Sequence, residues 1–202
     1  MPHVRYHGAR VRGPAFTAAA IATLLVAATA GAQPADPAIA DPFARRGWHL
    51  EVSAHAASET WTYNVSHETL FGVAAGVTYG MRDGLVFIAS GPLYYVDQRG
   101  ADAYLLGATF GVRRRIYRAR RASAYLEIDV GVSKADAITP PKGTQFNYLA
   151  AAAAGASVRL RDGLHLLAAL RWIHVSNASL AGPSRNPNTE AIGPQVGVLI
   201  GF

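Results

Sequence analysis

The segment 125–132 reads Tyr125-Leu126-Glu127-Ile128-Asp129-Val130-Gly131-Val132. Every second residue from Leu126 onward is aliphatic, and the residues between them include Glu127 and Asp129. Because successive side chains of a β-strand point to opposite faces, this pattern predicts a strand with one apolar and one polar face. The apolar residues do not follow the three- and four-residue spacing of an amphipathic helix.

The same period of two recurs along the chain. In addition to 125–132, we expect strands at 48–54, 71–79, 104–112, 146–160, 164–172 and 192–202. Residues 84–96 are predicted as a further strand, but Gly91-Pro92 interrupts the alternation and leaves its two faces unassigned. These eight strands predict an all-β fold.

The connections between the strands alternate in length. Short turns are expected at 81–84, 118–121 and 161–163, and the Asp-Gly pairs in two of them are typical of tight hairpins. Longer connections, together rich in Asn, Pro, Ser and Gly, are expected at 57–69, 97–102, 134–144 and 177–188. An even number of long strands with this asymmetry is typical of an antiparallel transmembrane β-barrel of the bacterial outer membrane.

A soluble barrel of the lipocalin type is the alternative for the same strand number. Its outward rows would be polar, whereas one row of nearly every strand here is apolar. The opposite rows carry small residues and the charged residues Glu51, Glu127, Asp129, Arg159 and Arg171. Charges of both signs can pair inside a narrow barrel, but a midplane Arg or Lys on the lipid face costs about 2–4 kcal/mol. We therefore expect the apolar rows to face lipid and the interior to be polar, packed and without a pore.

Aromatic residues gather near the predicted strand ends, as in the interfacial girdles of membrane barrels. The turn end has Trp48, Tyr79 and Phe202, and the loop end has Trp61, Tyr63, Tyr94, Phe146, Tyr148 and Trp172. The positions of these side chains support a membrane-spanning barrel.

Two other sets of polar residues receive structural interpretations. The second short turn gathers Arg113, Arg114, Arg115, Arg118, Arg120 and Arg121. Phosphate binding is one interpretation of this cluster, and solvation beside the head groups of the inner leaflet is the favoured one.

Of the histidines, we expect His49 and His165 to point inward, His55 to lie at a strand end and His67 in a loop. None of them belongs to a visible metal-ligand cluster.

The N-terminus has the organisation of a secretory signal, with basic residues before the apolar run 15–28 and an A-x-A cleavage site at Ala30-Gly31-Ala32. We expect residues 1–32 to be removed, 33–46 to be a flexible mature N-terminus and 47–202 to form the barrel. An uncleaved membrane anchor is the alternative. Three of the 19 basic residues lie in the leader, so the remaining excess over 13 acidic residues is too small to indicate nucleic-acid binding.

His174 and Ser176 continue the apolar row of the strand 164–172, so both are expected to face lipid at the extracellular end. Two positions along a strand place backbones about 6.6–6.8 Å apart on one face, a span that an imidazole can close toward a hydroxyl. The pair therefore fits a general base beside a nucleophile. Glu190, the only acid after Asp162, begins the next strand in the same outward row. It is the candidate for the group that orients the imidazole.

The run Ile173-His174-Val175-Ser176-Asn177-Ala178-Ser179-Leu180, followed by Asn186-Pro187-Asn188 and Glu190, resembles the C-terminal signature of the lipid A 3-O-deacylase (PagL) family. The resemblance implies an outer-membrane barrel with a His, Ser and Glu triad that faces the membrane. It also implies hydrolysis of the ester-linked 3-hydroxyacyl chain at the 3-position of lipid A, the lipid of lipopolysaccharide, without a metal or cofactor. The motif match covers about the last 30 residues.

The motif departs from the family pattern at two points. Ser179 stands where the family usually has Gly, and the stretch between Ser176 and Glu190 is about two residues longer. The family's loop Asn, a candidate donor to the oxyanion, therefore corresponds to Asn188 or Asn186, and the preceding proline favours Asn188. Asn177 has inward parity, so we expect it to hold the loop from within the barrel.

Two functions compete with the esterase. In a non-catalytic small barrel, structural or adhesin-like, His174 and Ser176 would be rim residues. An acyltransferase would use the same nucleophile with an acyl acceptor other than water. The sequence leaves open whether the chain forms a homodimer. Its expected surroundings are outer-membrane lipids, with lipid A as substrate.

Overall fold

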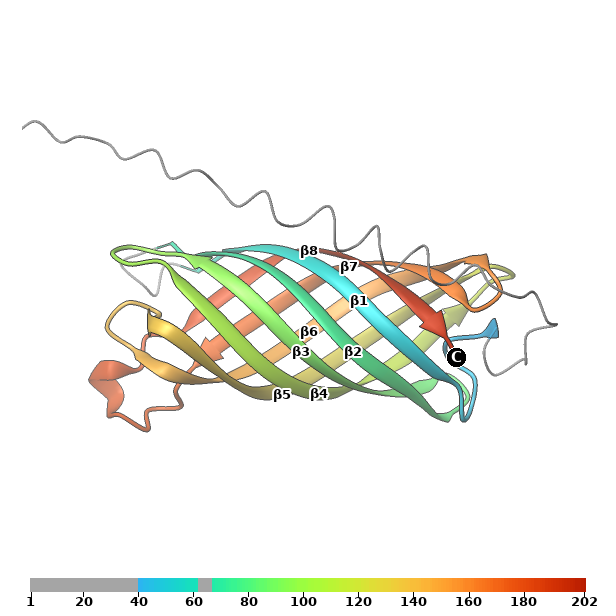
Figure 1. Ribbon diagram of the computed structural model, residues 1–202, viewed down its shortest axis with the longest axis horizontal. Coiled ribbons are helices and arrows are strands. Elements are labelled where there is room, and N and C mark those ends of the chain that lie inside the picture. Colours follow the sequence, from blue (N-terminus) through green and yellow to red (C-terminus); the bar gives the residue numbers. More distant parts are fainter. Residues whose placement is uncertain (1–39, 62–66) are drawn as a thin grey trace, which may run out of the picture. The chain divides into compact units, whose positions relative to one another are not determined.

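The computed structural model describes residues 40–61 and 67–202. Eight antiparallel strands form a closed barrel, in which each strand pairs with its sequence neighbours and β8 pairs with β1 (Figure 1). The strands are β1 (Trp48–Glu59), β2 (Thr69–Arg82), β3 (Leu85–Asp97), β4 (Ala103–Arg118), β5 (Ala122–Thr139), β6 (Thr144–Arg161), β7 (Leu164–Ser176) and β8 (Thr189–Gly201). The predicted eight-stranded all-β barrel is confirmed. The predicted leader, residues 33–39 and Tyr63 lie outside the described residues.

The outer and inner faces follow the alternation of the sequence. On β5, Ile128 is 62% exposed, whereas its neighbours Glu127 and Asp129 are each 5% exposed. Large exposed side chains occupy the outward rows of the other strands in the same way, as at Leu106, Phe110 and Leu170. Because β-strand side chains alternate strictly, each apolar row forms part of one continuous apolar outer wall. Among the described residues, no helix is long and apolar enough to cross a membrane.

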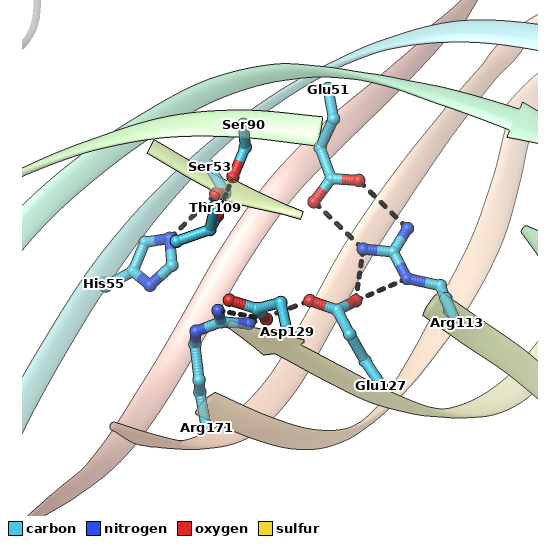
Figure 2. Close-up of polar contacts among 9 residues, drawn as sticks. All are labelled: Glu51, Ser53, His55, Ser90, Thr109, Arg113, Glu127, Asp129 and Arg171. Carbon is cyan, nitrogen blue, oxygen red and sulfur yellow. Dashed lines mark hydrogen bonds and ion pairs between the residues drawn. The ribbon is translucent and has the colours of Figure 1, made fainter. Parts of the chain in front are cut away.

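Ion pairs fill the middle of the barrel (Figure 2). Arg113 lies between two carboxylates, 3.0 Å from Glu51 and 2.6 Å from Glu127. Arg171 continues the chain of charges, at 2.8 Å from Glu127 and 2.6 Å from Asp129. Buried charges are tolerated when they are paired and hydrogen-bonded, so this network accounts for the charged inward rows.

Three residues differ from the sequence-based prediction because they belong to the interior. Arg113 is included in the predicted arginine cluster at the second turn, but its parity on the strand decides its place: it lies in the inward row of β4, opposite Glu127 in the register, and is 1% exposed. The alternation of β3 continues through Gly91 and Pro92, so Tyr94 points inward and is not part of the aromatic girdle. His55 is not a strand-end residue either: it is buried, 2.8 Å from the Ser53 hydroxyl and edge-on to Tyr94.

The connection between β5 and β6 is shorter than predicted. A loop was expected over 134–144, but β5 continues to Thr139 and β6 begins at Thr144. The alternation persists in this extension, with Ala135 buried and Ile138 exposed. The outward row changes here from aliphatic residues to Lys134 and Asp136, so the apolar row by which the other strands were predicted is missing. The pairing with β6 also shifts register between Lys134 and Thr139.

Residues 40–46, the described part of the segment expected to be flexible, pack against the barrel end. Phe43 is fully buried, with its ring 6.2 Å from that of Tyr125. Asp41 accepts hydrogen bonds from Arg115 at 2.8 and 2.9 Å. The aromatic contact and the charge pair explain why this segment is fixed although it is rich in Pro and Ala.

Candidate active site

His174 and Glu190 are directly opposite each other in the β7–β8 pair. Both belong to outward rows, and Ser176 follows His174 in the same row of β7. Opposite residues of an antiparallel pair have their Cβ atoms about 4.5–5.5 Å apart, so the register alone brings the imidazole to the carboxylate. The loop after β7 lies at the end of the barrel away from the C-terminus (Figure 1).

The His174 ring contacts a different partner through each of its nitrogens. Its Nε2 is 3.0 Å from the Ser176 hydroxyl, and its Nδ1 is 3.2 Å from Glu190 Oε1. If Nδ1 carries the hydrogen and donates it to the carboxylate, Nε2 is left to accept the hydrogen of the hydroxyl. The arrangement thus contains a hydroxyl, a base and an acid in the order that nucleophilic catalysis requires.

Glu190 is held at both of its carboxylate oxygens. The indole N–H of Trp172 donates to Oε2 at 3.1 Å, and the Asn188 amide donates to Oε1 at 3.3 Å. The ring of Trp172 also stacks on that of His174, with 5.8 Å between the centroids and an interplanar angle of 27°. Trp172 therefore touches two members of the group, a role that its assignment to the aromatic girdle did not include. Its position two residues before His174 in the same row was the available signal.

The three side chains lie in the outer wall and are partly shielded. His174 and Glu190 have side chains 25% and 21% exposed, and Ser176 is 8% exposed as a residue. Across the β6–β7 pair, Ala150 stands opposite His174 and Ala152 opposite Trp172. These small outward residues leave the approach to the group open from the side of the barrel.

Asn177 fixes the loop that follows Ser176. It is 2% exposed, and its amide donates to Thr144 Oγ1 at 3.0 Å and to the carbonyl of Arg185 at 2.5 Å. Its Oδ1 accepts the backbone N–H of Ser179 at 3.0 Å. These contacts agree with the inward parity expected for Asn177. They tie it to the start of β6 and join the two sides of the loop to each other.

Ala178 and Ser179 have positive φ angles, 52° and 61°. Glycine adopts this left-handed region with little cost, so the conformation gives a physical reason for the Gly that the motif usually has at the position of Ser179. Here the Ser179 hydroxyl accepts a hydrogen bond from the Asn186 amide at 3.2 Å. The substitution thus adds a contact where glycine would have had none.

The two candidate loop asparagines lie in different places. Asn186 Oδ1 accepts the backbone N–H of Asn177 at 2.9 Å, so this side chain rests against the turn that directly follows Ser176. Asn188 instead donates a hydrogen bond to Glu190.

Within residues 40–61 and 67–202, no cluster of three or more His, Cys, Asp or Glu could hold a metal ion.

Comparison with known proteins gives a matching family model and several solved structures of similar fold. A family model described as Lipid A 3-O-deacylase (PagL) matches residues 39–198. The crystal structure of Neisserial surface protein A (NspA) is 15% identical, with a TM-score of 0.57, over 77% of this chain and 97% of that chain. The crystal structure of the outer membrane enzyme PagL is 17% identical, with a TM-score of 0.53, over 74% and 98%. No curated protein sequence matches the chain significantly.

Proposed function

The chain belongs to the lipid A 3-O-deacylase (PagL) family, and we propose that Ser176, His174 and Glu190 are its catalytic triad. Membership makes the protein an ester hydrolase of lipid A in the bacterial outer membrane. The bond attacked in this proposal is the ester that links a 3-hydroxyacyl chain to the 3-position of lipid A.

The observation that carries the proposal is the chain of contacts from Ser176 through His174 to Glu190 on the outward face. Polar side chains on a lipid-facing wall lower the stability of the barrel, so their presence there calls for a function. Three of them in catalytic order are not needed for stability. A site that opens sideways reaches only molecules that lie in the membrane. A lipid whose ester lies near the head-group level meets that requirement.

In the proposed reaction, Ser176 Oγ attacks the acyl carbonyl carbon while its proton passes to His174 Nε2. Glu190 stabilises the resulting imidazolium through Nδ1. When the tetrahedral intermediate collapses, the bond between the acyl carbon and the sugar oxygen breaks. That oxygen leaves with the sugar and takes the proton from His174. Water then attacks the acyl-enzyme with His174 as base again, which releases the 3-hydroxy fatty acid and restores the Ser176 hydroxyl.

The oxyanion of that intermediate needs a donor close to Ser176. The contact of Asn186 Oδ1 with the backbone N–H of Asn177 supports Asn186 for this task, because it brings the side chain next to the residue that follows the nucleophile. One hydrogen of its Nδ2 is donated to Ser179, and the other is left for the oxyanion. The contact of Asn188 with Glu190 supports an orienting role instead. This assignment reverses the order that the proline before Asn188 favoured.

The outward alanines of β6 support an acyl chain as the neighbouring group. Ala150, Ala152 and Ala154 run beside β7 from His174 toward the middle of the barrel, opposite His174, Trp172 and Leu170. Larger aliphatic residues of β5, among them Ile128 and Val130, border the row on its other side. A shallow channel of this kind would receive the chain whose ester reaches Ser176.

The direct test is Ser176→Ala, expressed in cells that contain the substrate and followed by mass spectrometry of extracted lipid A. The expected result is a folded barrel with no release of the 3-hydroxy fatty acid. Ser58→Ala is the matched control, because Ser58 is an exposed outward residue of β1 near the same end of the barrel as Ser176. This variant should deacylate lipid A normally. Deacylation by Ser176→Ala at the normal rate would refute the triad, and fatty acid found on another acceptor would indicate a transferase.

A further inference from the structure

A group of arginines surrounds a hollow at the end of the barrel away from the candidate active site. We call it the basic mouth; it comprises Arg115, Arg118, Arg120, Arg121 and Arg159. These residues lie at the end of β4, in the turn to β5 and near the end of β6. Short turns of outer-membrane barrels face the periplasm, so the mouth opens on that side.

Backbone hydrogen bonds hold the rim of the basic mouth in place. The N–H of Ala119 donates to the carbonyl of Ala122 at 2.7 Å, and the N–H of Arg159 donates to the carbonyl of Arg121 at 2.7 Å. The second bond ties the β4–β5 turn to β6. The arginines therefore project from a fixed frame, which reduces the entropy lost when they bind a common ligand.

The basic mouth already binds one anionic group of the chain itself, the carboxylate of Asp41. Arg115, with a side chain 11% exposed, contacts its carboxylate at 2.8 Å and lies over the Phe43 ring, and Arg118 is 3.5 Å away. Burial by itself would raise the pKa of Asp41, but the hydrogen bonds from Arg115 and from the Phe43 N–H bring that pKa below its ordinary value. The neighbouring arginines thus favour a negative charge.

The acidic groups near the basic mouth do not balance its five arginines. The Arg118 side chain is 67% exposed despite its contact with Asp41, and the ion-pair partner of Arg159 is Asp162, an exposed residue 3.5 Å away. Arg120 and Arg121 have no ion-pair partner in the described part of the chain. Guanidinium groups match the planar geometry of phosphate oxygens and bind them with two parallel hydrogen bonds.

We propose that the basic mouth binds a phosphate group, next to Asp41, through Arg118, Arg120 and Arg121. The phosphate can belong to an anionic phospholipid of the periplasmic leaflet or to a soluble phosphate compound. Exposed apolar side chains adjoin the mouth, at Ile116 and Tyr117 of β4, which places it at the border of the hydrocarbon region. This position favours the phospholipid.

The test uses the full barrel in detergent micelles and native mass spectrometry with added phosphatidylglycerol or phosphatidylcholine. The variant Arg118→Gln/Arg121→Gln should retain phosphatidylglycerol about 5- to 10-fold less than the unmodified protein, with phosphatidylcholine unchanged. Arg99→Gln/Lys134→Gln is the matched control: it removes the same charge from exposed residues at the other end and should retain phosphatidylglycerol normally. Both variants should deacylate lipid A normally, which also shows that they are folded.

A second arm distinguishes the source of the phosphate. Inorganic phosphate is titrated into the lipid-free protein and then into the protein with bound phosphatidylglycerol. If inorganic phosphate displaces the lipid, and the Arg118/Arg121 variant does not show this competition, the site is assigned to soluble phosphates. If the lipid stays bound in the presence of phosphate, the site is assigned to phospholipid. Equal lipid retention by the two double variants, together with no phosphate binding that depends on Arg118 and Arg121, would overturn the proposal.

Discussion

Trp172 donates its indole N–H to Glu190 Oε2 while its ring stacks on His174, so one side chain touches both partners of the proposed proton relay. These contacts make Trp172 a positioning residue: it touches the acid and the base and acts through them. The neighbouring donor Asn188 holds the other oxygen of the same carboxylate. An acid fixed at both oxygens keeps the imidazole in one orientation, which is the main task of the third member of a triad.

Trp172→Phe tests this positioning because it removes the N–H and keeps an aromatic ring beside His174. We expect kcat to fall about 3- to 10-fold with KM little changed, since the carboxylate loses a fixed donor. The measurement is the initial rate of fatty-acid release from lipid A in micelles over a range of lipid A concentrations. A change in KM alone would leave Trp172 with a structural role. Glu190→Ala should reduce the rate further, by roughly 10²- to 10⁴-fold, and still less than Ser176→Ala.

The loop asparagines provide a second prediction, because they contact different parts of the site. Asn186→Ala should lower kcat by about 10²- to 10³-fold, the usual loss when an oxyanion donor is removed. Asn188→Ala should cost about 10-fold or less, since Trp172 still holds Glu190. Steady-state kinetics of the two purified variants on lipid A makes the comparison. If Asn188→Ala is the more damaging change, the two roles must be exchanged.

The interior network provides a third prediction, one that concerns stability. Arg113→Met leaves Glu51 and Glu127 without their shared partner inside the barrel. Removal of one partner of a buried ion pair costs about 3–5 kcal/mol, so the free energy of unfolding in urea and detergent should fall by that order. Deacylation measured well below the unfolding midpoint should remain close to normal, because Arg113 does not touch the candidate site. Arg114→Met, an exposed residue of the same strand, is the control and should unfold normally.

Much of the architecture and part of the site follow from local sequence. The alternation at Leu126, Ile128 and Val130 suffices to predict a strand with one face toward lipid, because the direction of successive side chains is a property of the extended backbone itself. The same parity places His174, Ser176 and Glu190 in outward rows before any strand is paired.

What only the tertiary structure decided is which residues meet across strands and loops. The register of β7 with β8 sets Glu190 opposite His174, and that of β4 with β5 sets Arg113 opposite Glu127. A local pattern contains no such distances, so the sequence around an arginine does not show whether its side chain lies in a solvated turn or between two buried carboxylates. The places of Asn186 and Asn188 likewise depend on how the loop packs against Asn177, since a loop has no period from which side-chain direction can be predicted.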